Sequence, residues 1–340
     1  MRAAILIFAM SLPGMVSAQD SASTSAKPSA VAAAQTPRPG AANPPARQRR
    51  RGTMVGYIAD GTIEDYVRVR FDAGYDNNVP DRAEFFYAQC GCNGGGAPGP
   101  GSPGAQDLAT SLNFQQLLVD FQYAPHERVA VFGSVPLRFV QPQSFLGEIL
   151  RPPQTSNTFE GGSGLSDIRA GVKASIFSND NSLLAAQVQF FFPSGDAKKG
   201  LGTDHTSFES ALLFHHRLSD RFTIESQFGD WHPIGGSSAT GTDYAGDVLF
   251  YGVGPSFELV NNGRLRFAPV IELVGWHVLG GQQQNAGTLG PADGTNIVNL
   301  KFGARTTFDE VSSFYVGYGH SLTDDRWYNN ILRFEYKYSF

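Results

Sequence analysis

Short segments in which large apolar side chains alternate with polar ones dominate the chain. In residues 66–75, Val67 and Val69 fall on one face while Arg68 and Arg70 fall on the other. Successive side chains of a β-strand point to opposite faces, so a period of two predicts a strand. One such strand fits a soluble sandwich equally well. Repetition constrains the fold, because the pattern recurs about twelve times before the C-terminus.

The links between these segments alternate in length. Short turns occupy residues 126–128, 178–182, 218–221, 260–264 and 309–312, and longer links occupy residues 76–111, 141–166, 193–206, 232–245 and 279–295. The link at residues 323–328 is a short exception. Bacterial transmembrane barrels combine short periplasmic turns with longer extracellular loops. We therefore predict an all-β fold: a transmembrane antiparallel up-and-down β-barrel of about 12 strands over residues 64–340, preceded by a disordered N-terminal segment.

Composition agrees with a barrel. Aromatic residues make up 12% of the chain, and charged residues make up 17%, below the roughly 25% of an ordinary globular domain. After the N-terminus, no apolar run reaches the roughly 18 residues that a membrane-spanning helix needs. The net charge of −5, with no strongly basic domain, gives no reason to expect a nucleic-acid partner.

The charges of the predicted strands gather on one face. A charge facing lipid near the bilayer midplane costs roughly 2–4 kcal/mol, so this face is predicted to line the lumen. The lumen-lining candidates are Arg68, Arg70, Asp72, Asp120, Arg138, Arg169, Lys173, Glu209, Glu225, Glu272, Lys301, Arg305, Arg333, Glu335 and Lys337. Two interpretations stay open: the charges line a path that attracts small anions, or they pair across strands and fill the interior.

The N-terminal residues indicate export. Arg2, an apolar stretch over residues 3–10 and the small residues 16–18 form the pattern of a cleavable signal peptide, residues 1–18. Residues 19–63 are predicted to be a disordered Ala/Pro-rich and basic periplasmic tail, because residues 19–51 contain almost no large apolar side chains. The basic run at residues 47–51 is either a solvated linker end or a contact for anionic lipid headgroups or cell-wall polymers.

The C-terminal strand ends on alternating aromatic residues. Phe334, Tyr336, Tyr338 and the terminal Phe340 share one face. This resembles the carboxy-terminal strand that the outer-membrane assembly machinery recognises, and the four residues are our assembly-signal candidates. The expected partners are therefore outer-membrane lipid, the barrel-assembly machinery and a small-molecule solute.

The remaining chemical motifs are sparse. Cys90 and Cys92 are a disulfide candidate, with a reactive redox pair as the alternative. A zinc site would need four ligands, and we predict no metal and no cofactor. Large aromatic residues near the predicted outer strand ends are expected to form an interfacial girdle, with ligand stacking as the alternative; they are Trp231, Tyr244, Trp276, Trp327 and Tyr328.

A candidate hydrolytic site is also weak. Ser207, Ser210, His215 and His216 form the His/Ser cluster of the chain, with Asp204-His205 just before it. Catalysis by such a cluster would require an orienting acid and oxyanion donors. The sequence identifies neither group, so we predict that the protein is not an enzyme.

Two short motifs resemble a known family. Residues 164–168, Gly-Leu-Ser-Asp-Ile, and residues 192–196, Phe-Pro-Ser-Gly-Asp, resemble the Gly-Leu-x-Asp and Pro-Thr-Gly-Asp segments of the outer-membrane barrel family of the meta-pathway of phenol degradation. Ser194 stands where that family more often has Thr. The resemblance covers about residues 110–340, and the Cys-bearing loop and basic tail depart from it. It implies a Gram-negative outer-membrane protein and a putative transporter of small or hydrophobic compounds.

The number of strands limits the width of the lumen and therefore the roles that we expect. Barrels of eight strands are filled by side chains, and those of sixteen or more leave an open aqueous channel. We expect an intermediate, porin-like barrel in the bacterial outer membrane that acts as a narrow passive channel or transporter for small solutes. The alternative is a structural or interaction barrel that presents extracellular loops and has a non-conducting lumen.

Overall fold

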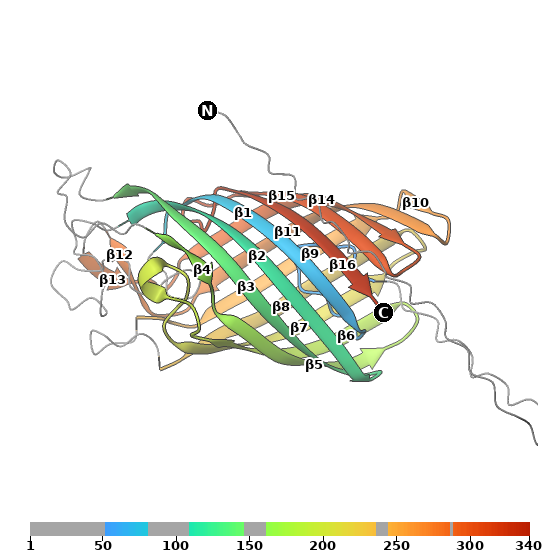
Figure 1. Ribbon diagram of the computed structural model, residues 1–340. Coiled ribbons are helices and arrows are strands. Elements are labelled where there is room, and N and C mark those ends of the chain that lie inside the picture. Colours follow the sequence, from blue (N-terminus) through green and yellow to red (C-terminus); the bar gives the residue numbers. More distant parts are fainter. Residues whose placement is uncertain (1–51, 81–108, 146–160, 236–243, 286–287) are drawn as a thin grey trace, which may run out of the picture. The chain divides into compact units, whose positions relative to one another are not determined.

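The computed structural model describes residues 52–80, 109–145, 161–235, 244–285 and 288–340 (Figure 1). The chain divides into residues 1–48, which lie outside the described residues, and a unit of residues 49–340. The predicted signal peptide, the basic run and the pair Cys90/Cys92 also lie outside the described residues. The described residues contain no helix with the length and hydropathy needed to span a bilayer.

Long antiparallel strands follow one another along the described chain. They are β1 (Tyr66–Asn77), β2 (Ala109–His126), β3 (Val129–Phe145), β5 (Ile168–Ser178), β6 (Ser182–Phe192), β7 (Thr206–Arg217), β8 (Phe222–Ile234), β9 (Val248–Phe257), β11 (Leu265–Val278), β14 (Asn296–Phe308), β15 (Ser312–Ser321) and β16 (Asn330–Ser339). The short strand β4 (Gly162–Leu165) extends the pairing with β3, and β10 (Val260–Asn261) pairs with β11. Strands β12 (Gln282–Asn285) and β13 (Thr288–Pro291) form a separate hairpin.

The long strands close into a barrel. Neighbours in sequence pair with one another, and β1 pairs with β16 from Tyr66↔Ser339 to Tyr75↔Asn330. The barrel closes where β9 pairs with β11. The short strand β10 lies between them in sequence and pairs with the first residues of β11. In the part of the chain that the structure describes, the wall therefore has twelve strands. The predicted all-β barrel and its strand number are confirmed.

Side chains alternate strictly across the wall. In β16, Phe334 is 47% exposed on the outside, whereas Glu335 is 4% exposed on the inside. The outer face is covered by large apolar side chains on every wall strand. Contiguous apolar surface of this extent is unusual on a soluble monomer, and it is the normal lipid-facing surface of a transmembrane barrel.

The two ends of the barrel differ in their connections. At one end, which we call the short-turn end, tight turns join β2 to β3, β5 to β6, β7 to β8 and β14 to β15. At the long-link end, β1 ends at Asn77 and β2 begins only at Ala109. The long-link end also carries the β12–β13 hairpin and the 3₁₀ turn Ala197–Lys199. The start of β1 and the end of β16 both lie at the short-turn end (Figure 1).

The structure corrects one boundary of the sequence analysis. Residues 52–63 were assigned to the disordered tail, but the structure places them inside the barrel. Met54, Val55 and Ile58 are at most 4% exposed. Residues 19–51 contain almost no large apolar side chains, whereas residues 52–63 supply apolar side chains and backbone groups that the lumen wall binds. We call residues 52–65, which precede β1, the luminal segment.

Candidate functional site

Carboxylates of the wall bind the backbone of the luminal segment. Glu272 of β11 accepts the N–H groups of Gly56 at 2.9 Å, Tyr57 at 2.8 Å and Ile58 at 2.9 Å. Glu225 of β8 accepts from Met54 N at 2.8 Å. These bonds resemble a capping arrangement, in which a buried carboxylate satisfies several backbone donors that form no regular secondary structure.

Cations of the wall bind the opposite polar groups of the segment. Arg305 donates to the carbonyl of Val55 at 2.7 Å, and Arg333 donates to that of Gly56 at 2.5 Å. Lys337 contacts the Asp60 carboxylate at 2.7 Å, and Lys173 donates to the Asp60 carbonyl. Burial raises the pKa of the Asp60 carboxyl, but the cations, Lys337 before Lys173, together hold it well below its usual range.

The contacts give the segment a re-entrant path. Gly52 contacts Arg266 at the short-turn end, and Tyr57 reaches the middle of the lumen. The chain then returns, because Ala124 near the end of β2 donates to the Asp65 carboxylate. The segment therefore runs from the short-turn end to the middle of the lumen and back, and it contacts wall strands around the barrel, including β2, β5, β8, β11 and β16.

Apolar packing completes the interface. Val55 and Ile58 form a buried cluster with Val270, Val274 and Tyr315 of the wall. A Cβ at Gly56 would lie 2.1 Å from the Tyr315 ring, so position 56 requires glycine for this close approach. The segment is thus held by shape as well as by charge.

Tyr57 lies at the tip of the segment between two cations. Its ring centroid is 3.9 Å from Lys301 Nζ and 4.1 Å from Arg333 Cζ. Lys301 also donates to the Tyr328 hydroxyl at 2.7 Å. Burial raises the pKa of Tyr328, so this hydroxyl stays protonated. The tip forms the floor of the space toward the long-link end.

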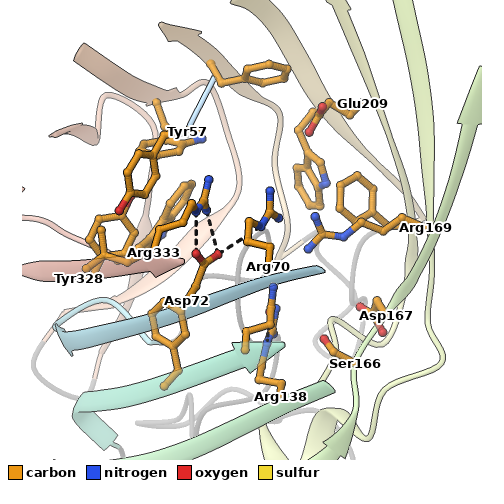
Figure 2. Close-up of a pocket in the computed structure, with 18 of the residues that line it drawn as sticks. Tyr57, Arg70, Asp72, Arg138, Ser166, Asp167, Arg169, Glu209, Tyr328 and Arg333 are labelled. Carbon is orange, nitrogen blue, oxygen red and sulfur yellow. Dashed lines mark hydrogen bonds and ion pairs between the residues drawn. The ribbon is translucent and has the colours of Figure 1, made fainter. Parts of the chain in front are cut away.

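A cavity of about 200 Å³ opens above the tip (Figure 2). We call it the long-link cavity. Its charged lining residues are Arg70, Asp72, Arg138, Asp167, Arg169, Glu209, Lys301 and Arg333, and its aromatic lining residues are Tyr57, Phe114, Phe191, Trp231, Phe250, Trp276, Trp327 and Tyr328. The lining therefore combines guanidinium groups with aromatic rings.

A second cavity of about 250 Å³, the central cavity, lies beside the luminal segment. It is lined by Ile58, Ala59 and Asp60 of the segment and by wall residues that include Lys173 and Gln187. The two cavities share the lining residues Tyr57, Arg70, Arg169, Glu209, Phe250, Trp276 and Arg333. The two cavities thus adjoin one another next to the tip of the luminal segment.

The predicted lumen-lining residues all lie on the inner face, where each is buried or half-buried. Many of them pair across strands. Arg333 makes two bonds to Asp72, at 2.6 and 2.8 Å (Figure 2), and Arg305 lies 2.8 Å from Glu335. Ion pairs therefore occupy part of the lumen, and Arg333 and Asp72 also line the long-link cavity. The path that attracts small anions stays a prediction.

The aromatic residues expected in an interfacial girdle instead point inward. Trp231, Tyr244, Trp327 and Tyr328 are at most 6% exposed and belong to one buried cluster, against which Trp276 packs. Strand parity would have found two of them. Trp231 has the parity of Glu225 in β8, and Trp276 has the parity of Glu272 in β11. Tyr244, Trp327 and Tyr328 lie outside the strands, where no alternating pattern indicates which way a side chain points.

The two motifs that resemble the phenol meta-pathway family meet at the long-link end. Asp167 accepts hydrogen bonds from Gly195 N at 3.0 Å and Thr203 N at 2.8 Å. Ser194 Oγ accepts from Ile168 N at 2.8 Å and donates to the Ser166 carbonyl at 2.9 Å. The motifs therefore fasten the link after β6 to the rim of the barrel.

His205 belongs to the same rim. Its Nδ1 lies 2.7 Å from the Thr203 carbonyl, and its ring packs edge-on against Trp231 at 5.8 Å. Burial lowers the pKa of His205, so the neutral ring donates to that carbonyl. The histidine therefore ties the link after β6 to the aromatic cluster at the rim.

The possible hydrolytic cluster is not assembled. His215 points inward, 3.6 Å from Glu225, whereas His216 points outward and contacts Ser182. Ser207 lies eight positions from His215 along β7, a separation of about 27 Å. Among the residues that the structure describes, no group of three or more His, Cys, Asp or Glu side chains is placed to hold a metal ion.

The assembly-signal candidates are all on the outer face of β16. Phe334, Tyr336, Tyr338 and Phe340 are each at least 38% exposed. This position leaves them available to lipid or to another protein during insertion. Their recognition by the assembly machinery stays a prediction.

Solved structures of outer-membrane proteins resemble the barrel. An outer membrane channel from Pseudomonas putida F1 has a TM-score of 0.50 and 14% identity, over 84% of this chain and 98% of that chain. The β domain of the Bordetella autotransporter BrkA has a TM-score of 0.46 and 11% identity, over 82% and 100% of the two chains. The NanC porin has a TM-score of 0.40 and 10% identity, over 81% and 98%.

The closed twelve-stranded wall and the likeness to the Pseudomonas channel agree on the fold. The chain has the fold of an outer-membrane β-barrel. No protein-family model matches the sequence, and neither does any curated protein. The relation to the phenol meta-pathway family is therefore not confirmed and stays a prediction. At these identities the likeness supports the architecture and carries no solute or activity.

Proposed function

We propose that the protein is an outer-membrane channel that lets small solutes pass through a lumen narrowed by its own luminal segment. One observation carries this proposal. The long-link and central cavities, of about 200 and 250 Å³, adjoin one another inside the barrel and share lining residues. In a barrel with a purely structural role, we would expect side chains to fill this space.

The proposal includes a location and an orientation. The apolar outer face fits an outer-membrane bilayer, and bacterial barrels place short turns in the periplasm. The short-turn end is then periplasmic, and the long-link end is extracellular. The luminal segment would enter from the periplasm, where the residues before it would also lie.

The luminal segment sets the expected conductance. Twelve strands enclose less space than the sixteen or more of general porins, and the segment occupies part of it. Passage of hydrated ions and small solutes is expected along the charged side wall. Selectivity would come from the charge and size of the solute.

Single-channel recording in planar bilayers tests the proposal. The folded full-length chain should give discrete openings of low conductance, and the same preparation after heat denaturation should give none. A folded, inserted barrel that never opens would overturn the channel. Insertion is verified separately, by protection of the strands from protease in liposomes.

A non-conducting barrel is the second candidate. The ion pairs Arg333–Asp72 and Arg305–Glu335 favour it, together with the segment that they support, because these groups fill much of the interior. Such a barrel would act through its long links. Liposomes containing it would not swell in isosmotic solutions of small sugars, whereas those containing the proposed channel would swell.

A further inference from the structure

We infer that the long-link cavity binds a small organic anion, with a carboxylate head and an apolar ring. The inference deepens the proposed function by naming a class of solute, and it relies on the lumen being reachable from outside. It does not rely on conduction. Binding inside the cavity can be measured on folded protein in detergent, so the two proposals can fail separately.

The charge of the cavity favours an anion. Five cationic and three acidic side chains line it. Two of the acids are already engaged: Asp72 accepts both bonds from Arg333, and Asp167 accepts from Gly195 and Thr203. Even when Glu209 is counted, the cations exceed the acids by two. Excess positive charge away from bulk water attracts an anion to compensate it.

Two guanidinium groups are placed to bind the head. Arg169 stacks over Phe191 at 4.9 Å, and its buried Nε has no hydrogen-bond acceptor. The Nε of Arg70 lies 3.5 Å from Asp72 without a hydrogen bond of good geometry. Figure 2 shows both side chains reaching into the cavity from different strands. A carboxylate would satisfy these donors in the bidentate geometry that guanidinium groups favour.

The aromatic side of the cavity is suited to the body of the ligand. Trp231, Phe250, Trp276 and Trp327 line it, and the rings of Trp276 and Trp327 are 4.8 Å apart. The same cavity therefore offers apolar ring surface as well as guanidinium groups. A ring with one carboxylate would contact both surfaces at once, whereas an inorganic anion would contact one.

Calorimetric titration of the folded full-length chain tests the inference. The probes are cyclohexanecarboxylate, its neutral amide and the cation cyclohexylmethylammonium, which share the ring and differ in the head. We expect saturable binding of the carboxylate alone. Arg169→Gln should weaken it about tenfold or more, since a hydrogen bond to a charged group is lost. Arg169→Lys should fall between the two.

The control is Arg128→Gln, which removes an exposed arginine from the short-turn end and should leave binding unchanged. Equal binding of carboxylate and amide would overturn the anion site. Full binding by folded Arg169→Gln and by Arg70→Gln would place the ligand elsewhere and overturn it as well. If the chain conducts but does not bind the carboxylate, the binding inference is wrong and the channel proposal stands. If the chain binds the carboxylate but does not conduct, the channel proposal is wrong and the binding inference stands.

Discussion

The luminal segment should leave the lumen when its main acceptor is changed, and Glu272→Gln is the sharpest such change. The glutamine oxygen can still accept from Gly56, but the new amide group replaces the oxygen that binds Tyr57 and Ile58 at 2.8 and 2.9 Å. The backbone N–H groups of Tyr57 and Ile58 would then face the N–H groups of the glutamine amide. The substitution keeps the volume of the side chain, so it tests hydrogen bonding and charge without opening a void.

The expected magnitude follows from two lost bonds. A hydrogen bond to a charged group contributes about 1.5–3 kcal/mol, and the lower value gives about 3 kcal/mol for the pair. This corresponds to about a hundredfold shift of the docking equilibrium toward the released segment. We call an opening wide when its conductance is higher than that of the ordinary openings, as expected once the segment has left the lumen. Single-channel recordings should show wide openings about a hundred times more often than in the parent chain.

A disulfide between the luminal segment and the wall tests whether the wide openings come from release of the segment. A Cβ at Gly61 would lie 3.4 Å from the Leu213 Cβ, close to the separation of Cβ atoms in disulfides. Gly61→Cys with Leu213→Cys, in a chain lacking the two native cysteines, should suppress the wide openings of Glu272→Gln when oxidised and restore them when reduced.

The matched control is Asp120→Asn. Asp120 is another buried lumen carboxylate, but it binds Arg68 of the wall at 2.9 Å and is not part of the grip on the segment. It should leave the frequency of wide openings near that of the parent chain. Wide openings that persist in the oxidised, locked Glu272→Gln chain would refute the view that the segment narrows the pore.

Three further outcomes are expected. Val316→Arg, at a position 52% exposed on the outer face, should destabilise the inserted barrel by about 2–4 kcal/mol, whereas Leu322→Arg beyond the strand end should cost about 0–1 kcal/mol, as measured by urea unfolding in liposomes. Asp167→Asn removes an acceptor for the link after β6, so limited proteolysis should cut that link about tenfold faster. Gly56→Ala places a methyl group against the Tyr315 ring, and recordings should show more frequent wide openings with unchanged heat stability of the barrel.

Most of the wall could be predicted from the sequence because lipid imposes a strict rule. Every strand must keep apolar side chains outside, so period two reports the inner and outer faces directly. Arg333 and Phe334 were placed correctly for this reason. The same parity would have placed Trp231 and Trp276 inside, but their size and position near strand ends suggested an interface instead.

The interior could not be predicted in the same way. Residues 52–65 have no period, because their backbone bonds go to side chains far away in sequence, such as Glu225 and Glu272. Which inner cation meets which acid depends on strand register around the whole cylinder. The pairing of Arg333 with Asp72 joins the first and last strands, and only closure of the barrel brings them together.

Nitroxide scanning in lipid vesicles tests the central arrangement most directly. Single cysteines are placed in turn at positions 332–337 of β16 and at position 57, in a chain without native cysteines, and each label is exposed to oxygen and to a polar nickel complex. The account predicts that oxygen access peaks at every second position of β16, beginning at Leu332, and that a label at Tyr57 is shielded from lipid. High access of the nickel complex to the labels at Leu332, Phe334 and Tyr336 would contradict it.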